Sequence, residues 1–165
     1  MVDRSGALGV YDGALRAIVH ALKYDARRSL ARPLGAMMRA RCDAVLDGAG
    51  CAVPVPLHWS RRRARGFNQA ADLAGQLHLP VHHALRRVRA TTAQAALPAS
   101  QRHRNVRHAF EPTRRARALA GAIVILVDDV STTGATLEAC ARALKAAGVA
   151  EVRAVTAARA VLSRR

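Results

Sequence analysis

The sequence predicts an α/β protein with a mostly parallel sheet, and three stretches in its last third carry that prediction. Residues 123–127 form an apolar run of strand length that is rich in β-branched residues. Residues 135–147 have apolar side chains at helical spacing, and Gly148 stands where helices commonly end. Residues 152–158 form a second apolar run. Strand, helix and strand in this order make a βαβ unit, whose strands pair in parallel through a right-handed crossover.

The first third of the chain predicts two helices. Residues 12–24 place apolar side chains on one helical face, with Asp12 as a candidate N-cap. Residues 29–45 show a similar stripe, in which Met37 and Met38 are interpreted as core filling. The face of the first helix consists of Leu15, Ile18, Val19 and Leu22.

The middle of the chain predicts shorter elements. Residues 52–56 look like a buried strand that stops at a proline, and residues 57–67 are polar, basic and irregular. Asn68 is expected to cap a helix that ends before Pro80, and a short strand is expected around Val88.

Residues 91–105 allow two interpretations. Residues 91–98 are small and polar, as in a loop, and Ser100 is expected to cap a short arginine-rich helix that ends near His108. This stretch could close over a bound ligand and exclude water, or it could be an ordinary surface loop.

Length and charge limit the classes of function. The chain has 165 residues, which fits one domain over residues 1–165, and its formal net charge is +16. Such a surface suits nucleic acid, phosphorylated metabolites or acidic membranes, although arginine-rich codon usage explains the charge equally well. Only 3% of the residues are aromatic, which argues against a platform for stacking bases.

Cysteine usage and hydropathy indicate a cytoplasmic protein. Cys42, Cys51 and Cys140 are odd in number and lack metal-ligand spacing, which argues against a disulfide framework and a structural zinc site. We also expect no signal peptide and no membrane-spanning helix, because no apolar run approaches the ~20 residues that a span needs.

The residues that follow the apolar run at 123–127 carry the chemistry. Asp128 and Asp129 are expected at the carboxyl end of the strand, where ligands of open α/β sheets bind. Residues 131–134, Ser-Thr-Thr-Gly, lead into a helix and offer hydroxyl and main-chain donors to a phosphate. Each half alone also occurs in ordinary strand–helix connections. Together, paired carboxylates and a phosphate-sized turn match a ribose 5-phosphate.

Residues 124–136 resemble the signature of type I phosphoribosyltransferases: four apolar residues, two acids, two further positions and a hydroxyl-and-glycine loop. Ser131 departs from that pattern, since many members carry an apolar or larger side chain there. The resemblance implies a type I phosphoribosyltransferase fold, with a mostly parallel sheet flanked by helices and a small variable hood.

More of the chain is similar to the ComF-like branch of this family, which is associated with competence and DNA uptake. Many such proteins begin with a cysteine-rich zinc-binding segment, and these 165 residues contain none, so a truncated chain and a member without that segment both stay open. The supporting stretches are Leu-Lys-Tyr at 22–24, Val-Pro-Val-Pro-Leu-His at 53–58, Arg-Gly-Phe-Asn-Gln at 65–69, and residues 94–97 and 104–110.

The resemblance implies a site for 5-phosphoribosyl-1-pyrophosphate (PRPP) with Mg²⁺ as cofactor. Asp128 and Asp129 are the implied catalytic residues and hold the ribose hydroxyls, directly or through Mg²⁺ and water. The implied pyrophosphate loop contains Leu57, His58 and Arg65, whereas residues 61–63 are interpreted as a solvated arginine cluster. The implied donor contacts are Val127, Asp128, Asp129, Ser131, Thr132, Thr133, Gly134, Ala135 and Thr136.

Two functions from different classes follow. One is a phosphoribosyltransferase that transfers its sugar to an unidentified nitrogen acceptor and releases pyrophosphate. The other is a non-catalytic or regulatory module of the same fold that binds single-stranded DNA during natural transformation. The arginine clusters at 61–65, 86–89, 102–107 and 114–117 motivate the second. The acceptor stays open, and a homo-oligomer stays possible.

Overall fold

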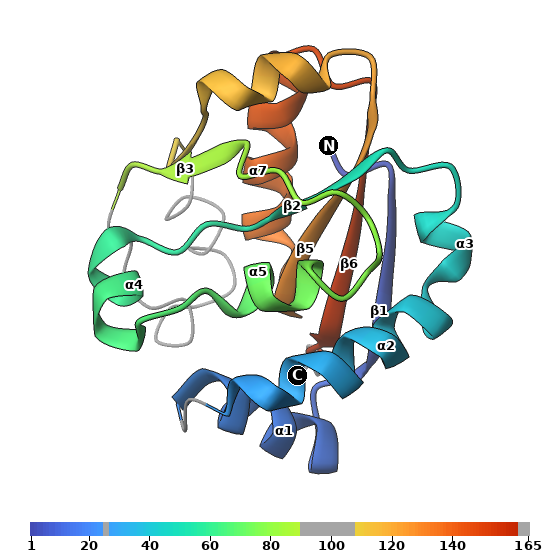
Figure 1. Ribbon diagram of the computed structural model, residues 1–165, viewed down its shortest axis with the longest axis vertical. Coiled ribbons are helices and arrows are strands. Elements are labelled where there is room, and N and C mark those ends of the chain that lie inside the picture. Colours follow the sequence, from blue (N-terminus) through green and yellow to red (C-terminus); the bar gives the residue numbers. More distant parts are fainter. Residues whose placement is uncertain (25–26, 90–107, 162–165) are drawn as a thin grey trace.

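A four-stranded parallel sheet forms the centre of the protein (Figure 1). The computed structural model describes residues 1–24, 27–89 and 108–161. In spatial order the strands are β1 (Arg4–Val10), β6 (Glu151–Arg159), β5 (Ile123–Ser131) and β2 (Cys51–Pro54). All neighbours pair in parallel, so the carboxyl ends of the strands meet at one edge. The predicted parallel α/β class is confirmed.

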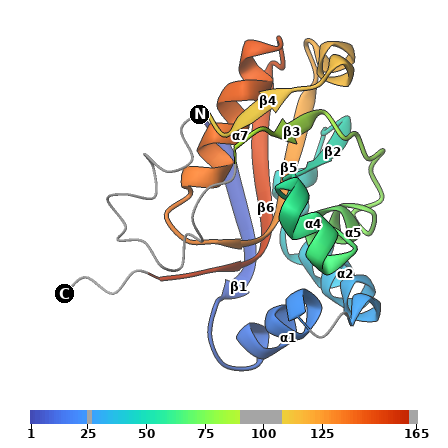
Figure 2. The same ribbon diagram turned by 90° about the vertical axis from the view of Figure 1, so that its left-hand side faces the viewer.

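Helices cover both faces of the sheet (Figure 2). The first face carries α1 (Gly13–Tyr24), α2 (Ala31–Arg41) and α5 (Gln69–Ala74), with the short η1 (Arg28–Leu30) and α3 (Asp43–Leu46). The second face carries α7 (Ala135–Ala146), the antiparallel pair β3 (Leu85–Arg87) and β4 (Phe110–Pro112), and η3 (Arg114–Leu119). Each face has its own buried apolar cluster.

The βαβ unit forms as the apolar pattern predicts. β5, α7 and β6 follow one another, and α7 buries Leu137, Cys140 and Leu144 against the second face. Gly148 follows the helix with φ 95°, a left-handed conformation that glycine adopts without the strain of a side chain. The helix at 12–24 and the Asn68 cap are also confirmed, since the Asn68 side chain accepts a hydrogen bond from the Ala70 amide at 3.1 Å.

Three element predictions need correction. The expected helix at 29–45 is divided into η1, α2 and α3, with a break at Cys42, and Met37 is 56% exposed rather than core filling. The irregular stretch 57–67 contains the helix α4 (Trp59–Arg65), because arginine and alanine favour helix even without an apolar stripe. β5 continues to Ser131, beyond the predicted end at residue 127.

Strand β1 lacks the composition that usually indicates a strand. Its sequence contains Gly6 and Gly9, which weaken strand propensity. A Cβ atom at Gly6 would lie 2.9 Å from the Cys42 Sγ, so the close packing between the strand and the break after α2 requires glycine there. The predicted loop at 91–98 and the helix expected after Ser100 lie outside the described residues.

Each helix in the described part of the chain is too short or too polar to cross a lipid bilayer.

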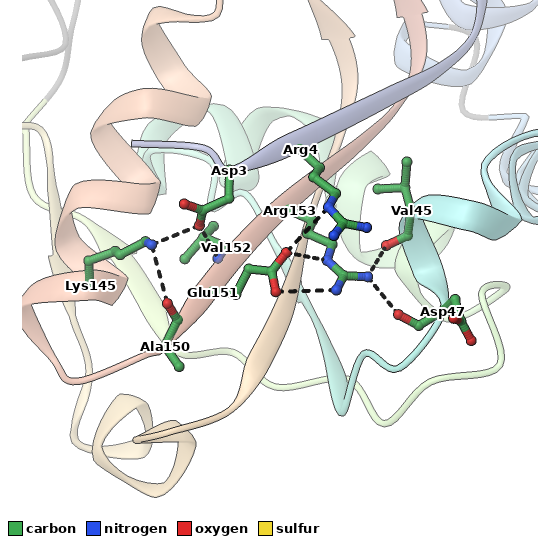
Figure 3. A network of polar contacts seen from close by, with 9 residues as sticks. All are labelled: Asp3, Arg4, Val45, Asp47, Lys145, Ala150, Glu151, Val152 and Arg153. Carbon is green, nitrogen blue, oxygen red and sulfur yellow. Dashed lines mark hydrogen bonds and ion pairs between the residues drawn. The ribbon is translucent and has the colours of Figure 1, made fainter.

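Polar contacts at the amino ends of the strands join β6 to β1, to α3 and to α7 (Figure 3). Arg153 is 5% exposed, and its guanidinium donates to the Glu151 carboxylate at 2.7 Å and to the main-chain oxygens of Val45 at 3.0 Å and Asp47 at 2.6 Å. Lys145 pairs with Asp3 at 2.7 Å. The network therefore fixes the end of the sheet opposite to the predicted site.

We expect Arg153→Met to lower the free energy of unfolding by about 1–2 kcal/mol, because two main-chain carbonyls lose a buried donor, whereas Glu151 is 27% exposed and keeps Arg4. Arg4 contacts the same Glu151 at 3.7 Å with its side chain 62% exposed, so Arg4→Met is the matched control and should cost less than about 1 kcal/mol. Urea denaturation measures both. If both variants lose the same free energy of unfolding, the contacts of the buried Arg153 do not stabilise the fold more than the exposed contact of Arg4.

Candidate functional site

The acid pair lies within a continuous strand. Strand β5 spans both acids, and its ladder with β6 pairs Asp128 with Thr156 and resumes with Val130 and Ser131 after Asp129. Successive side chains of a strand point to opposite faces. Leu126 belongs to the apolar cluster beneath α7, and Val127 belongs to the cluster beneath α1, α2 and α5. Asp128 therefore lies on the same face as Leu126, beneath α7, and Asp129 lies on the same face as Val127, beside α1.

Asp128 lies on the face of α7, beside the hydroxyl turn. It lines a small hollow with Val130, Ser131, Thr132 and residues 134–137. Its Oδ1 accepts a hydrogen bond from the Asp129 amide at 2.9 Å. Burial, followed by the negative charge of Asp129, raises the pKa of the Asp128 carboxyl to about 7. Around neutral pH this carboxyl is therefore divided between its protonated and ionised forms.

Asp129 lies on the opposite face, against the end of α1. Lys23 Nζ is 3.1 Å from Asp129 Oδ1, and the two side chains are only 19% and 12% exposed. This ion pair joins the first helix of the chain to the sheet. From the sequence, Lys23 in the Leu-Lys-Tyr run at 22–24 is a weak site candidate, and the exposed end of an amphipathic helix explains it equally well. In the structure its side chain is only 19% exposed and lies beside the acid pair.

The turn between β5 and α7 has the form expected of an anion site. Gly134 has φ 75°, which lets the chain turn sharply into the helix. The Ala135 amide donates to Thr133 Oγ1 at 3.4 Å, and the Glu138 amide closes the first helical turn on the Gly134 oxygen at 2.9 Å. The amino end of a 12-residue helix and three consecutive hydroxyl side chains thus meet at this point.

A larger cavity of about 300 Å³ lies on the other side of the same turn. Residues 131–134 form one of its walls, and β1 and β6 form another. Arg159 reaches across this wall and donates to Ser5 Oγ at 3.2 Å. The hydroxyl turn therefore separates two hollows, of which only the smaller one includes Asp128.

The segment after β2 comes to the same edge of the sheet. β2 pairs with β5, and the Val55 amide donates to the Val127 oxygen at 2.9 Å, so Leu57 and His58 follow directly beside the acid pair. His58 is buried, and its Nδ1 lies 2.8 Å from Ser60 Oγ. The topology thus brings the predicted pyrophosphate loop and the predicted ribose site together at the carboxyl ends of adjacent strands.

Arg65 occupies a different position within this segment. It ends α4, and its guanidinium lies 5.0 Å from the centre of the Tyr24 ring. A cation over the face of an aromatic ring is attracted by the ring quadrupole. Arg65 is therefore placed against the end of α1, next to the residue that pairs with Asp129.

The remaining predicted contacts are distributed along the strand and the helix start. Val127 is fully buried, and its carbonyl accepts the bond from Val55. Ala135 is buried and Thr136 half-buried, and both line the hollow beside Asp128.

One further cation, Arg87, lies near the Asp128 carboxyl and was missed from the sequence. Burial, followed by the charge of Arg61, lowers the pKa of Arg87, and the nearby Asp128 carboxylate partly offsets this. Arg87 therefore lies within electrostatic range of both, on the hairpin strand β3. Burial and the Asp128 charge also raise the pKa of the Cys140 thiol well above its ordinary value, so this thiol is not activated. Nothing in the local pattern around 86–89 distinguishes Arg87 from its neighbours.

The carboxylate oxygens at this site suit a hard cation such as Mg²⁺, which would take its remaining ligands from a bound phosphate and from water. Among the described residues, no group of three or more His, Cys, Asp and Glu side chains gathers as a metal cage. Mg²⁺ commonly uses one or two protein carboxylates together with substrate phosphates and water. The carboxylate of Asp128, beside a turn suited to phosphate, fits that mode of binding.

Comparisons with known proteins agree with the geometry. Residues 63–164 match the family model described as the phosphoribosyl transferase domain. The chain is 33% identical to "Competence protein F" of Haemophilus influenzae over 96% of its own length and 73% of that protein. It is 35% identical to "DNA utilization protein YhgH" of Escherichia coli K12, over 86% of its own length and 66% of that protein.

A third relative, "Competence protein ComFC" of Bacillus subtilis, is 39% identical over 59% of this chain and 39% of that protein. The present chain thus spans only part of each of these relatives. The match to the domain model and the similarity along almost the whole chain identify it as a member of the phosphoribosyltransferase domain family, in its ComF-like branch.

Proposed function

We propose that this protein binds PRPP with Mg²⁺ and transfers the phosphoribosyl group to a nitrogen acceptor, with release of pyrophosphate. The observation that supports this most directly is that Asp128 lies beside the turn into α7, where it lines a water-sized hollow of about 10 Å³ together with Ser131, Thr132 and residues 134–136. A carboxylate accepts hydrogen bonds from sugar hydroxyls, and a helix amino end binds phosphate. Ribose 5-phosphate carries both groups in one molecule.

The residues of the turn take the 5-phosphate. Main-chain amides at the start of α7 and the hydroxyls of Ser131, Thr132 and Thr133 donate to its oxygens, while the helix dipole favours the negative charge. The acid pair holds the ribose hydroxyls and orients the ring. Neither carboxylate needs to act as a nucleophile in this scheme, because orientation and electrostatics supply the catalysis.

The segment after β2 takes the pyrophosphate. Main-chain groups near Leu57 and His58 lie at the adjacent strand end, and Arg61, Arg65 and Arg87 supply positive charge from two further elements. The acid pair would hold Mg²⁺ when the cation is bound, and the cation would supply positive charge to offset the negative charge of the departing pyrophosphate. The acceptor nitrogen approaches the opposite side of the anomeric carbon as the ring gains oxocarbenium character.

We further propose that the activity serves DNA uptake or use and takes place in the cytoplasm. The names of the relatives, competence protein and DNA utilization protein, support the first part. Those proteins are longer than the region that aligns with this chain. The proposed connection with DNA uptake or use is therefore made for the shared domain only.

A second candidate function, binding of single-stranded DNA, is supported by a basic cleft. This cleft of about 490 Å³ is lined by the loop after β2 and by Arg28, His83 and Arg115, of which Arg28 also pairs with Asp72 at 2.7 Å. Arg114 and Arg117 are exposed on the same short helix, η3. Phosphate contacts from such side chains give affinity without base recognition. The cleft shares Leu57 with the proposed pyrophosphate segment, so DNA bound there would lie next to the PRPP site.

We expect the double substitution Asp128→Asn, Asp129→Asn to weaken PRPP binding at least about tenfold, because charged acceptors and the Mg²⁺ ligands are lost together. Isothermal titration calorimetry in constant Mg²⁺ measures the effect. Asp43→Asn, Asp47→Asn removes the same charge from two exposed carboxylates and should bind like the wild type. Equal PRPP affinity in the two double variants would refute the assigned site.

We expect Asp128→Asn alone to stabilise the ligand-free protein at pH 8 by about 1–3 kcal/mol. The folded pKa of Asp128, about 7, lies above its unfolded value, so ionisation weakens the native state as the pH rises from about 4 to 7. The variant lacks this loss, and its advantage should vanish below about pH 4. Urea denaturation across this range tests the sign, and an advantage that grows towards low pH contradicts it.

We expect a labelled single-stranded oligonucleotide to bind with an affinity that falls steeply between low and moderate salt. Reversing Arg114, Arg115 and Arg117 to Glu should weaken binding and flatten the salt dependence. The control variant reverses Arg16, Arg32 and Arg142, which are exposed on α1, α2 and α7. Fluorescence anisotropy compares them, and absent binding at low salt, or equal effects of the two variants, would count against the basic cleft as the DNA site.

A further inference from the structure

The helix α4, which spans Trp59–Arg65, has two faces of different character. Side chains four residues apart on a helix lie on the same face, whereas side chains two residues apart do not. Arg61 and Arg65 therefore share one face of α4, and Trp59 and Arg63 share another.

The face of Arg61 and Arg65 is directed toward the proposed PRPP site. The charge of Arg61 contributes to the lowered pKa of Arg87, and the Arg65 guanidinium lies 5.0 Å from the centre of the Tyr24 ring. Both arginines are half-buried. The proposed function thus accounts for this face of the helix and leaves the other face without a role.

The other face is exposed to solvent and carries the only tryptophan of the sequence. Trp59 is 67% exposed, and Arg63 is exposed beside it. A single exposed apolar side chain is common on protein surfaces, so exposure alone indicates no ligand. An aromatic ring next to a cation, however, is the combination that binds single-stranded nucleic acid, because the ring stacks on a base and the cation contacts a phosphate.

The neighbours of Trp59 fix the start of α4. His58 is buried, and its Nδ1 lies 2.8 Å from Ser60 Oγ. The ring centroids of His58 and Trp59 are 5.5 Å apart, with the two planes tilted by 45°. These contacts restrict the indole before any ligand binds, which reduces the conformational entropy that binding must remove.

The helix also borders the basic cleft that supports the second candidate function. Leu57, two residues before α4, and Gly66, directly after it, both line that cleft. Arg28 and Arg115 contribute positive charge to the same walls. Figure 1 shows α4 at the margin of the molecule, away from the sheet. A strand of DNA whose phosphates contact the cleft therefore has a continuous path to the exposed face of α4.

We propose that this face extends the candidate DNA site: one base of single-stranded DNA stacks on Trp59, and an adjoining phosphate pairs with Arg63. The inference rests on the second candidate function. The low aromatic content of the chain argues against a platform for several bases, whereas one exposed indole serves a single base. Stacking uses the flat face that every base has, so this contact adds affinity with little dependence on sequence.

The test compares two strands of equal length and charge, an oligothymidylate and a strand of abasic sites. Fluorescence anisotropy of a labelled strand measures affinity, and the emission of the single tryptophan reports directly on Trp59. The wild-type protein should bind oligothymidylate about tenfold more tightly than the abasic strand, since a stacked base contributes in that range. Binding of oligothymidylate should also quench the tryptophan emission.

Three variants separate the ring from the charge. Trp59→Phe keeps an aromatic face and should retain most of the preference for oligothymidylate. Trp59→Leu keeps an apolar side chain without the ring and should bind the two strands within about twofold of each other. Arg63→Gln should weaken binding of both strands by the same factor, because it removes a phosphate contact.

Salt dependence provides a second readout that a merely structural role would not change. Trp59→Leu should keep the wild-type slope of affinity against salt, because the indole neutralises no phosphate, whereas Arg63→Gln should lower that slope by about one. The variants should unfold close to the wild-type temperature, since both positions are exposed. PRPP affinity should stay at the wild-type value.

The outcomes separate this inference from the proposed functions. A wild type that binds neither strand at low salt overturns both the second candidate function and the inference. Equal affinity of the wild type for the two strands, or a Trp59→Leu variant that keeps the preference, overturns the inference and leaves the basic cleft as the DNA site. Quenching by PRPP but not by DNA assigns the indole to the PRPP site and also overturns the inference.

Discussion

Parallel pairing between β5 and β6 is the constraint on which the rest of the site depends. Strand β5 spans Ile123–Ser131 and pairs with β6 at residues 123–128 and again at 130–131. The contacts of Asp128 with the hydroxyl turn and of Asp129 with Lys23 show that these two consecutive side chains point to opposite faces, as is usual in a strand. The acid pair is therefore divided between two environments, one beside the hydroxyl turn and one beside α1, and each environment sets the chemistry of its own carboxylate.

The two environments differ in how they treat negative charge. A close ammonium compensates the charge of Asp129, whereas the hollow of Asp128 raises the pKa of its carboxyl to about 7. A raised pKa of this kind is common at sites that bind a ligand or cation, and it supports the proposed function. Both apolar clusters reach the acid pair, since Leu126 and Val127 precede it on β5 and belong to one cluster each.

The sequence predicted the parts of the fold that strong periodicity determines. The unit of β5, α7 and β6 follows from its apolar pattern, and the Asn68 cap follows from its residue type. Strand β1 escaped prediction because its propensity is low, and the sheet partner and the close approach at Gly6 determine its conformation. The end of β5 was placed too early because acids are rare inside strands, so composition suggested a loop where pairing with β6 continues.

For the site, the sequence located the local motif and the family resemblance but not the long-range contacts. Asp128 and the turn at 131–136 are neighbours along the chain, and their shared hollow follows from that proximity. Lys23 and Arg87 reach the acids from elements far away in the sequence, and only the packing of α1 and β3 brings them there. Side chains of these types occur at many exposed positions, so their pattern alone does not mark them.

The strand order has one more consequence, for synthesis of the chain. Among the described residues, β1 (Arg4–Val10) pairs in the sheet with β6 (Glu151–Arg159) alone. Of the four strands of this sheet, the one synthesised earliest must therefore wait for the one synthesised latest before it can pair. Until then both edges of β1 are open, and such sequence-distant pairing is typical of slow folding and exposure to aggregation. The two glycines of β1 and its first residue, Arg4, lower the tendency of this unpaired strand to pair with another chain.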